Sequence, residues 1–423
     1  MKKAKLIFNS LWALAMVATV SFLISCGGDE EAAVELTIVS LNAGDDDLNG
    51  ATSPDGVSVS SVISGIFSTD LDPASAASNI TLVNDFDDSE VDINVVASGR
   101  ALTITPAEPL FGGSLYVLTL KAGLSSTKGK TLGADITRTF TTVGSFTPQN
   151  VIAHWTFEDN ADDQVGDFDA DAEIAITYTD SRNAAAGKAA TFDGDVSIIE
   201  VPGAAELMNR ADFTLSYWAK TNSEGHVNET GDPTGHFVMG LGAFHGFQTE
   251  ITGSYRDFKV ASTMEYGDGT TGTGGDLVWN GDGKTKDNEG WKGTVFSKAD
   301  GDLTASLKDK WVHVTFVFSG TEKYRELYIN GDLKKRQEFE LWGSEYKEPT
   351  AVGLKFDNSA EVENVLAFGF VQSRGGTLWS NEPWGNYNLP TSQHFKGKLD
   401  DVRIFSVAVT AEEIKKMYDS EKP

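Results

Sequence analysis

Short runs of alternating apolar and polar residues make up most of the chain, and Asp-Gly, Ser-Gly, Gly-Gly and Pro turns separate them. Alternation with a period of two places every second side chain on one face, as in a β-strand with one buried face. In the first part of the chain this pattern is clearest at residues 36–39, 57–59, 93–96, 102–104 and 115–120. This spacing, over about 110 residues, predicts a β-sandwich of about seven strands at residues 35–143.

A second series of predicted strands follows a linker at residues 144–150, which contains Gly144 and Pro148. The strongest candidates are residues 151–157, 213–219, 311–318, 326–329, 365–370 and 399–405. Strands do not alternate with helices between residues 151 and 423, so we expect a jelly roll or a large sandwich there.

The only convincing helix is at the C-terminus. Thr410, with Glu413 three residues later, has the spacing of a capping box, in which each side chain binds the other residue's backbone N–H. Ile414, Met417 and Tyr418 then fall on one helical face. The sequence therefore predicts an all-β protein that ends in a short helix.

Residues 1–25 read as a secretory signal peptide, because Lys2, Lys3 and Lys5 precede an almost wholly apolar run at residues 6–24. An uncleaved anchor helix is the alternative, since the run approaches the length that spans a bilayer. The run ends in Leu-Ile-Ser-Cys at Cys26, which resembles a bacterial lipobox. This resemblance implies lipidation of Cys26, the only cysteine in the chain.

An acidic tether is expected at residues 26–34, where Gly-Gly-Asp-Glu-Glu follows Cys26. The cluster resembles the signal that sends lipoproteins of Bacteroidota-type cells to the outer face of the outer membrane. We therefore expect a lipid-anchored protein of the outer membrane that faces the cell exterior. A solvated spacer is the plainer interpretation, and the choice between the periplasmic and external faces stays open.

The formal net charge of −28 bears on the possible partners. Such a chain repels phosphate backbones, and we find no Lys or Arg cluster that would overcome this repulsion. Nucleic acid is therefore excluded as an expected partner. Strong acidity favours solubility and attracts cations, including Ca²⁺.

Residues 35–143 resemble the bacterial Ig-like repeats of the SbsA type. The matching motifs are Ser-Gly-Ile-Phe-Ser at 64–68, Leu-Thr-Ile-Thr-Pro at 102–106, Pro-Leu at 109–110, Tyr-Val-Leu-Thr-Leu at 116–120 and Thr-Phe-Thr-Thr at 139–142. The resemblance implies a spacer domain between the lipid and the rest of the chain.

Residues 151–423 resemble the LamG-like, concanavalin A-like jelly rolls. The motifs, in family order, are Trp-Thr-Phe-Glu at 155–158, Gly-Lys-Ala-Ala-Thr-Phe-Asp-Gly at 187–194, Asp-Phe-Thr-Leu-Ser-Tyr-Trp at 212–218, Trp-Val-His-Val at 311–314, Leu-Tyr-Ile-Asn-Gly at 327–331 and Gly-Lys-Leu-Asp-Asp-Val-Arg-Ile at 397–404. Residues 223–310 depart from the family, being long and rich in glycine, and we expect extended loops or an inserted hairpin there.

The same resemblance implies one structural Ca²⁺ where the first and last strands meet, with Glu158, Asp193 and Asp400 as ligands. Carboxylates suit Ca²⁺, which binds oxygen at flexible geometry. On the other interpretation, Asp193 fixes an Asp-Gly turn and Asp400 flanks a strand.

Aromatic residues in predicted loops are the candidate ligand-binding residues, because the apolar face of a sugar ring stacks on an indole or a phenol. Trp379, Trp384 and Tyr387 stand in a segment rich in Gly, Asn and Pro, and Trp279 and Trp291 also lie outside convincing strands. The plainer expectation for any one of them is that it folds back over the sandwich edge.

Recognisable catalytic motifs are missing: we find no Glu-x-Asp-x-x-Glu strand, no histidine triad, no nucleophile elbow and no nucleotide loop. We therefore expect a non-catalytic, lectin-like protein that captures polysaccharide at the cell surface, with glycan-uptake proteins as possible partners. Fold alone does not fix function. The alternatives are an adhesion or scaffold lipoprotein that binds proteins, and a glycan-cleaving enzyme with an unrecognised carboxylate pair.

Overall fold

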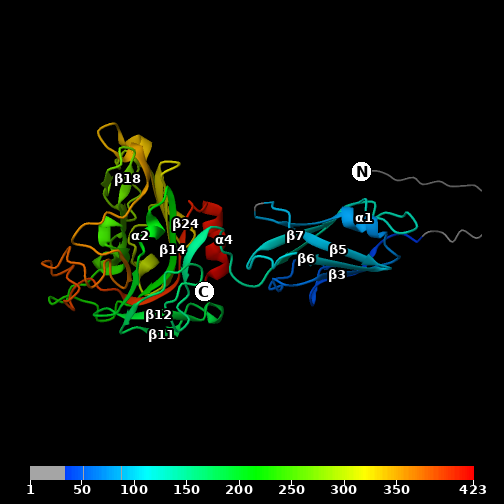
Figure 1. Cartoon of the computed structure of the whole chain (residues 1–423), viewed down its shortest axis with the longest axis horizontal. Coiled ribbons are helices and arrows are strands. Elements are labelled where there is room, and N and C mark those ends of the chain that lie inside the picture. The colour runs from blue at the N-terminus through cyan, green and yellow to red at the C-terminus, as the bar shows by residue number, and fades with distance from the viewer. Residues whose placement is uncertain (1–33, 51, 87) are drawn as a thin grey trace, which may run out of the picture.

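The computed structural model describes residues 34–423, with the exception of residues 51 and 87. These residues form two β-domains joined end to end (Figure 1). The predicted fold class is confirmed: an Ig-like sandwich precedes a jelly roll, and a short helix closes the chain. The predicted signal peptide, Cys26 and nearly all of the acidic tether lie outside the described residues. No helix within the described part of the chain is both long and apolar enough to span a membrane.

The Ig-like domain consists of two sheets that enclose a core containing Leu41, Phe67, Leu118 and Phe140. One sheet has the order β2-β1-β3-β6-β5, formed by β1 (Ile38–Ala43), β2 (Asp46–Asp47), β3 (Ile63–Phe67), β5 (Ile93–Ser98) and β6 (Ala101–Pro106). The other has the order β4-β7-β8, formed by β4 (Ile80–Asn84), β7 (Leu115–Leu120) and β8 (Ile136–Thr141). Helix α1 (Pro73–Ser78) precedes β4, and Asp72 caps its N-terminus.

The larger sheet of the jelly roll has nine antiparallel strands. Its order is β11-β12-β27-β14-β22-β23-β24-β21, and β9 pairs with β27 beside this path. The strands are β9 (Val151–Trp155), β11 (Thr177–Asp180), β12 (Lys188–Asp193), β14 (Asp212–Thr221), β21 (Thr294–Ser297), β22 (Trp311–Ser319), β23 (Tyr324–Ile329), β24 (Asp332–Glu338) and β27 (Lys396–Phe405).

A sheet of seven strands packs against it, in the order β10-β13-β26-β15-β16-β17-β20. Its strands are β10 (Ala172–Ile174), β13 (Ile198–Pro202), β15 (His236–Leu241), β16 (Phe247–Ile251), β17 (Phe258–Ser262), β20 (Leu277–Trp279) and β26 (Val365–Phe368). A small third sheet contains β18 (Met264–Tyr266), β19 (Thr271–Gly272) and β25 (Ala351–Leu354), and two short helices, α2 (Ala205–Met208) and α3 (Thr304–Leu307), complete the domain.

The main core lies between the two large sheets. Phe213, Leu215 and Tyr217 of β14 point into it, and Phe247 and Ile251 of β16 meet them from the other sheet. Because side chains alternate along a strand, the residues between these point to the outer faces. Each large sheet therefore has a second, outward-facing side: the C-terminal helix packs on that of the nine-stranded sheet, and a groove lies on that of the seven-stranded sheet.

The outer face of the nine-stranded sheet is covered by α4 (Ala411–Glu421), whose Ile414 and Met417 pack on Val317, Tyr328 and Phe405. The predicted capping box is confirmed, because Thr410 Oγ1 accepts a hydrogen bond from Glu413 N and the Glu413 carboxylate accepts one from Thr410 N.

The linker between the domains is held against this same helix. Phe146 packs into the α4 cluster, its backbone N–H donates to Ser420 Oγ at 2.9 Å, and its ring meets Phe86 of the Ig-like domain at 5.2 Å. The Lys416 ammonium lies 3.9 Å from the centre of the Phe86 ring. The junction is therefore a packed contact that joins the linker, α4 and the Ig-like domain.

The expectation of loops or one hairpin at residues 223–310 is wrong. This region supplies β15, β16, β17 and β20 to the seven-stranded sheet, and the edge strand β21 to the nine-stranded sheet. Strand β16 reads Phe-Gln-Thr-Glu-Ile, and the polar Thr249 on its core-facing side breaks the apolar–polar alternation of a half-buried strand. Residues 223–235 and the glycine-rich part after β18 consist mainly of loops, turns and very short strands.

Candidate functional site

A groove of about 570 Å³ lies on the outer face of the seven-stranded sheet. Its floor is formed by residues of three adjacent strands that point away from the core: Phe237 of β15, Gln248 and Glu250 of β16, and Lys259 and Ala261 of β17. Antiparallel pairing sets Glu250 opposite Lys259 and Gln248 opposite Ala261. The sheet ladder therefore fixes the spacing of these floor residues.

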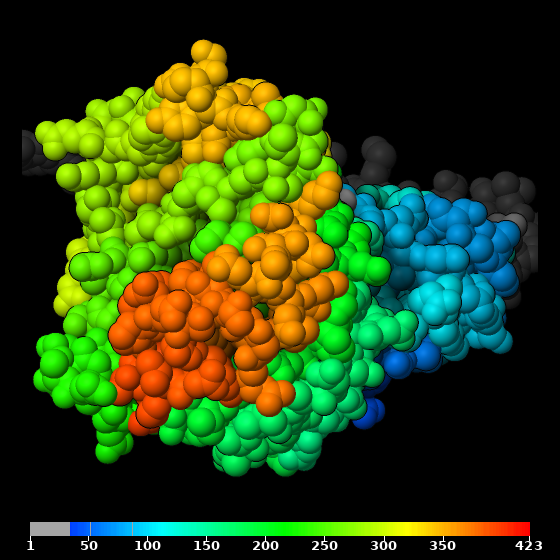
Figure 2. Space-filling view, turned by 60° about the vertical axis from the view of Figure 1, so that its left-hand side comes forward, coloured from blue at the N-terminus to red at the C-terminus, as the bar shows by residue number. Residues whose placement is uncertain are grey.

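One wall of the groove comes from residues 369–395, the connection between β26 and β27. The indoles of Trp379 and Trp384 line the groove, with ring centres 5.0 Å apart. Trp379 stacks on Phe237 at 5.8 Å and meets Phe244, which also lines the groove, at 6.0 Å. Figure 2 shows this connection, in orange to orange-red, raised on the surface of the jelly-roll domain.

Turns within the connection hold the two indoles in place. Glu382 N–H donates to Trp379 O at 2.9 Å, and Gln393 N–H donates to Trp384 O at 3.0 Å. Gly385 is required at its position, because a Cβ there would lie 2.7 Å from Trp379 Cβ. The aromatic wall is therefore built into the fold of this segment.

The polar groups of the groove form one connected set. Glu250 accepts a hydrogen bond from Gln248 Nε2 at 3.2 Å, and its other oxygen lies 2.8 Å from the Lys259 ammonium. Burial opposes the charge of Lys259, but the hydrogen bond and charge of Glu250 outweigh it and raise the Lys259 pKa. Gln248 Oε1 is buried and accepts no hydrogen bond from the described residues. A buried amide oxygen without a donor is costly, so a donor from a ligand would be favourable here.

Two of the five predicted ligand-binding residues line this groove, namely Trp379 and Trp384. Tyr387 stands behind them: its hydroxyl donates to Val196 O at 2.6 Å, and its ring packs on Phe370 and His394. It supports the aromatic connection and does not line the groove.

Trp279 and Trp291, the other two predicted ligand-binding residues, do not line this groove. Trp279 lies in strand β20 and is fully buried in the main core, where its Nε1 donates to Lys298 O at 3.2 Å. Trp291 is exposed but belongs to another cluster, with its ring 5.7 Å from Trp342 and 5.4 Å from Tyr346.

Sequence reasoning missed the floor of the groove and Phe244, which also lines it. Phe237, Gln248, Glu250 and Lys259 belong to strands that were not predicted, and Phe244 follows β15 in a short turn. One signal was present: Gln248 and Glu250 are two residues apart, between the apolar Phe247 and Ile251, which places both on one face of a strand.

The three carboxylates expected to share a Ca²⁺ are not brought together. Asp193 accepts hydrogen bonds from the backbone N–H groups of Asp195, Val196 and Ser197. It therefore fixes the Asp-Gly turn, which was the alternative to a role as a metal ligand. Glu158 accepts the backbone N–H of Lys188 at 2.9 Å. The described residues contain no group of three or more His, Cys, Asp or Glu side chains that is arranged to hold a metal ion.

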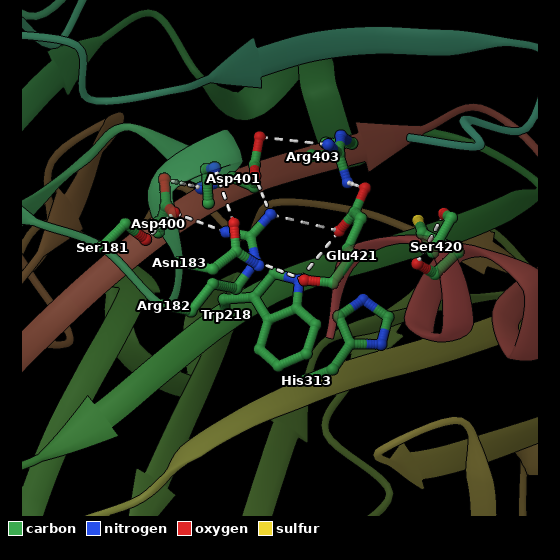
Figure 3. A network of polar contacts seen from close by, with 12 residues as sticks. Ser181, Arg182, Asn183, Trp218, His313, Asp400, Asp401, Arg403, Ser420 and Glu421 are labelled. Carbon is green, nitrogen blue, oxygen red and sulfur yellow. Dashed lines mark hydrogen bonds and ion pairs between the residues drawn. The ribbon is translucent and has the colours of Figure 1, made fainter. Parts of the chain in front are cut away.

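Asp400 faces a protein cation instead (Figure 3). The Arg182 guanidinium donates to both Asp400 and Asp401, the latter at 2.6 Å, and Ser181 donates to Asp400 as well. Glu158 and Asp400 do line one cavity, of about 350 Å³, but Asp193 does not. These three side chains therefore do not fit a shared Ca²⁺ site, because Arg182 and Ser181 already donate to Asp400 and Asp193 lies outside the cavity.

Arg182 is the centre of a buried network of charges that joins the strands of the nine-stranded sheet to the end of α4. Glu421 accepts the indole N–H of Trp218 at 2.8 Å and pairs with Arg403 at 2.7 Å. Asp401 contacts Arg403 at 3.0 Å. Buried charges of this kind are tolerated when each has a partner, and breaking one pair leaves an uncompensated charge. The network is a structural feature of the outer face that carries α4.

Three histidines of the jelly-roll domain, namely His226, His236 and His313, are buried. His313 is fully buried beneath α4 and bonds Ser216 Oγ at 2.8 Å, and burial lowers its pKa to about 3. His226 and His236 stack with ring centres 4.4 Å apart, and burial lowers the pKa of each. His245 lies apart from them, beside Asp357.

Comparison with known families identifies residues 46–142 as similar to the bacterial Ig-like domain family. This agrees with the predicted nature of the first domain. No curated protein matches the chain.

Among solved structures, 64% of this chain aligns with the receptor-binding domain of botulinum neurotoxin type G (14% identity, 51% of that chain, TM-score 0.37). The same share aligns with the binding domain of Paraclostridial Mosquitocidal Protein 1 (15% identity, 52% of that chain, TM-score 0.39). It also aligns with domain 4 of AbnA, a GH43 extracellular arabinanase from Geobacillus stearothermophilus, in complex with arabinotriose (17% identity, 98% of that chain, TM-score 0.37). The chain thus spans about half the length of the first two structures, and likenesses this distant carry no functional argument.

Proposed function

We propose that this protein is a non-catalytic glycan-binding protein whose ligand lies in the groove between the Trp379–Trp384 wall and the floor residues of β15, β16 and β17. The observation that carries the proposal is the pairing of an aromatic wall with hydrogen-bonding groups on a fixed floor. Ligand sites combine apolar and aromatic surface with a few placed polar groups, and sugars present both an apolar ring face and hydroxyls.

In its cellular setting, the proposed role is capture of polysaccharide at the surface of an outer membrane, with Cys26 as the lipid anchor and the Ig-like domain as spacer. Support for the anchor comes from the sequence, through the basic and apolar segments that precede Cys26. Incorporation of labelled fatty acid into the wild-type chain, and its loss in Cys26→Ser, would test the anchor. Protease treatment of intact cells would test the outward orientation.

Binding is tested with a glycan array and the chain from residue 26 onward, carrying Cys26→Ser so that it stays soluble. We expect binding to at least one polysaccharide, and a loss of about fivefold or more in affinity in Trp379→Ala and in Trp384→Ala, because each indole supplies a stacking face. Calorimetry with the polysaccharide so identified measures the change.

The chain offers a matched control in Trp291→Ala, because Trp291 and Trp384 are each 40% exposed but only Trp384 lines the groove. We expect Trp291→Ala to keep wild-type affinity. A folded chain that binds no glycan would contradict the proposal and favour a protein-binding adhesin. Release of reducing ends from a bound glycan would instead identify an enzyme.

A further inference from the structure

We propose that the groove selects uncharged glycans and discriminates against those that carry carboxylate or sulfate groups. This inference rests on the proposed function, since it names the class of ligand that the same groove would take. Its basis is the balance of charges and of hydrogen-bond donors and acceptors among the groove residues.

Negative charge is in excess in the groove. Glu250 and Asp276 both line it, and Lys259 is the only cationic side chain among its described lining residues. That ammonium already forms an ion pair with Glu250, because it lies 2.8 Å from a Glu250 oxygen. The three charged groups thus leave one net negative charge and no unpaired cation in the groove, and this charge would repel an anionic sugar.

The hydrogen-bond acceptors of the groove also favour uncharged glycans over anionic ones. Gln248 uses its amide N–H on Glu250, and its own carbonyl oxygen is buried without a donor. Carboxylates of Glu250 and Asp276 add further acceptors and no donors at neutral pH. A sugar hydroxyl can donate to these acceptors, whereas a carboxylate or sulfate group at the same point has no hydrogen to donate and would leave Gln248 Oε1 unsatisfied.

The chain as a whole reinforces this local preference. With a formal net charge of −28, it slows the approach of polyanionic chains at low ionic strength, and salt screens this long-range part. The local part, which comes from groups at the groove, is screened less. We therefore expect the preference to shrink but to persist as salt is raised.

The test uses chemically matched pairs of polymers. Laminarin and galactomannan, which carry free primary hydroxymethyl groups, are each presented beside a sample in which those groups have been oxidised to carboxylates. We expect the wild-type chain to bind a neutral polymer at least about tenfold more tightly than its oxidised partner. Equal or tighter binding of the oxidised polymer overturns the inference while leaving the proposed function standing. Binding to neither form of any polymer overturns the proposed function itself.

Variants that remove one negative charge show which carboxylates cause the preference for neutral polymers. Asp276 is exposed, so Asp276→Asn leaves the core untouched, and we expect it to narrow the neutral-to-oxidised preference about threefold or more. Glu250→Gln should narrow it further, because it also releases Lys259 from its partner. The matched control is Asp55→Asn, which removes the same charge from an exposed site in the Ig-like domain. An equal effect of Asp55→Asn would mean that the net charge of the chain, and not the groove, sets the preference, and would overturn the assignment.

Discussion

Among single residues, Asp400 shows most clearly how burial and charge compete in this protein. Burial and the neighbouring charge of Asp401 raise its pKa to about 8, although Arg182 and Ser181 act in the opposite direction. For Asp401, burial alone would raise the pKa, but Arg403 and the hydrogen bond from His154 lower it. Two adjacent carboxyl groups on one strand are thus pushed in opposite directions by their surroundings.

A carboxyl group in the unfolded chain titrates near about pH 4. Between that pH and about 8, the folded chain holds a proton on Asp400 that the unfolded chain has lost. The contribution of Asp400 to stability therefore falls as the pH rises through this interval, by at most about 1.4 kcal/mol per pH unit.

Replacing Asp400 with Asn should remove this contribution, since an amide has the same shape and does not ionise. We expect the thermal midpoint of Asp400→Asn to rise relative to wild type as the pH is raised from about 5 to about 8. Asp401→Asn should instead lower the midpoint across the interval, because Asp401 is stabilised as the anion. Parallel pH curves for wild type and Asp400→Asn would contradict the raised pKa.

Residue types and local order predicted part of the groove and could not predict the rest. Trp379 and Trp384 were identifiable because tryptophans among Gly, Asn and Pro are unusual outside a core. The same signal misplaced Trp279, which lies in a three-residue strand too short to show a period. Asp400 was expected at a metal, because sequence spacing cannot show that Arg182, more than 200 residues away in the chain, supplies the opposing charge.

At the scale of elements, α4 was predictable because its determinants are local. The capping box and the apolar stripe are set by residues within one segment, and both are observed. Strands β15, β16 and β17 were not predictable in the same way, because they have only five or six residues each, too few to establish a clear period. Their pairing partners decide their conformation, and those partners are distant in the sequence.

The capping box makes a testable contribution to α4. Thr410→Ala removes the side-chain acceptor for Glu413 N and the hydroxyl that donates to the Glu413 carboxylate. We expect a loss of about 1 kcal/mol in the stability of the jelly-roll domain, measured by denaturant unfolding. Thr410→Ser keeps the hydroxyl and should retain most of that stability. A Thr410→Ala chain as stable as wild type would show that packing alone holds the helix.

At the scale of the whole molecule, the junction fixes how the two domains meet. The contacts of Phe146 and Phe86 lie on the side of the jelly roll that carries α4, whereas the groove lies on the outer face of the opposite sheet. The groove is therefore open while the linker is docked. Sequence reasoning placed the linker at residues 144–150, but it gave no sign that Phe146 packs against a helix more than 260 residues away.

Loosening this junction should free the domains without unfolding them. Phe86→Ala removes the ring that meets both Phe146 and Lys416. We expect small-angle scattering to show a broader distribution of domain separations, with both thermal transitions retained, because Phe86 belongs to the core of neither domain. Val39→Ala, at an exposed position of the Ig-like domain, is the control. A scattering curve unchanged by Phe86→Ala would mean that the remaining contacts suffice.

The floor and the aromatic wall of the groove differ in how easily their sequences can change. Its floor belongs to a hydrogen-bonded sheet, where a substitution must respect the ladder and the core beneath it. Its aromatic wall belongs to residues 369–395, a connection without extended strands whose length is only weakly constrained by chain entropy. Evolution or an engineer can therefore exchange that one connection and obtain a new specificity on an unaltered scaffold, much as antibodies vary their loops on a constant framework.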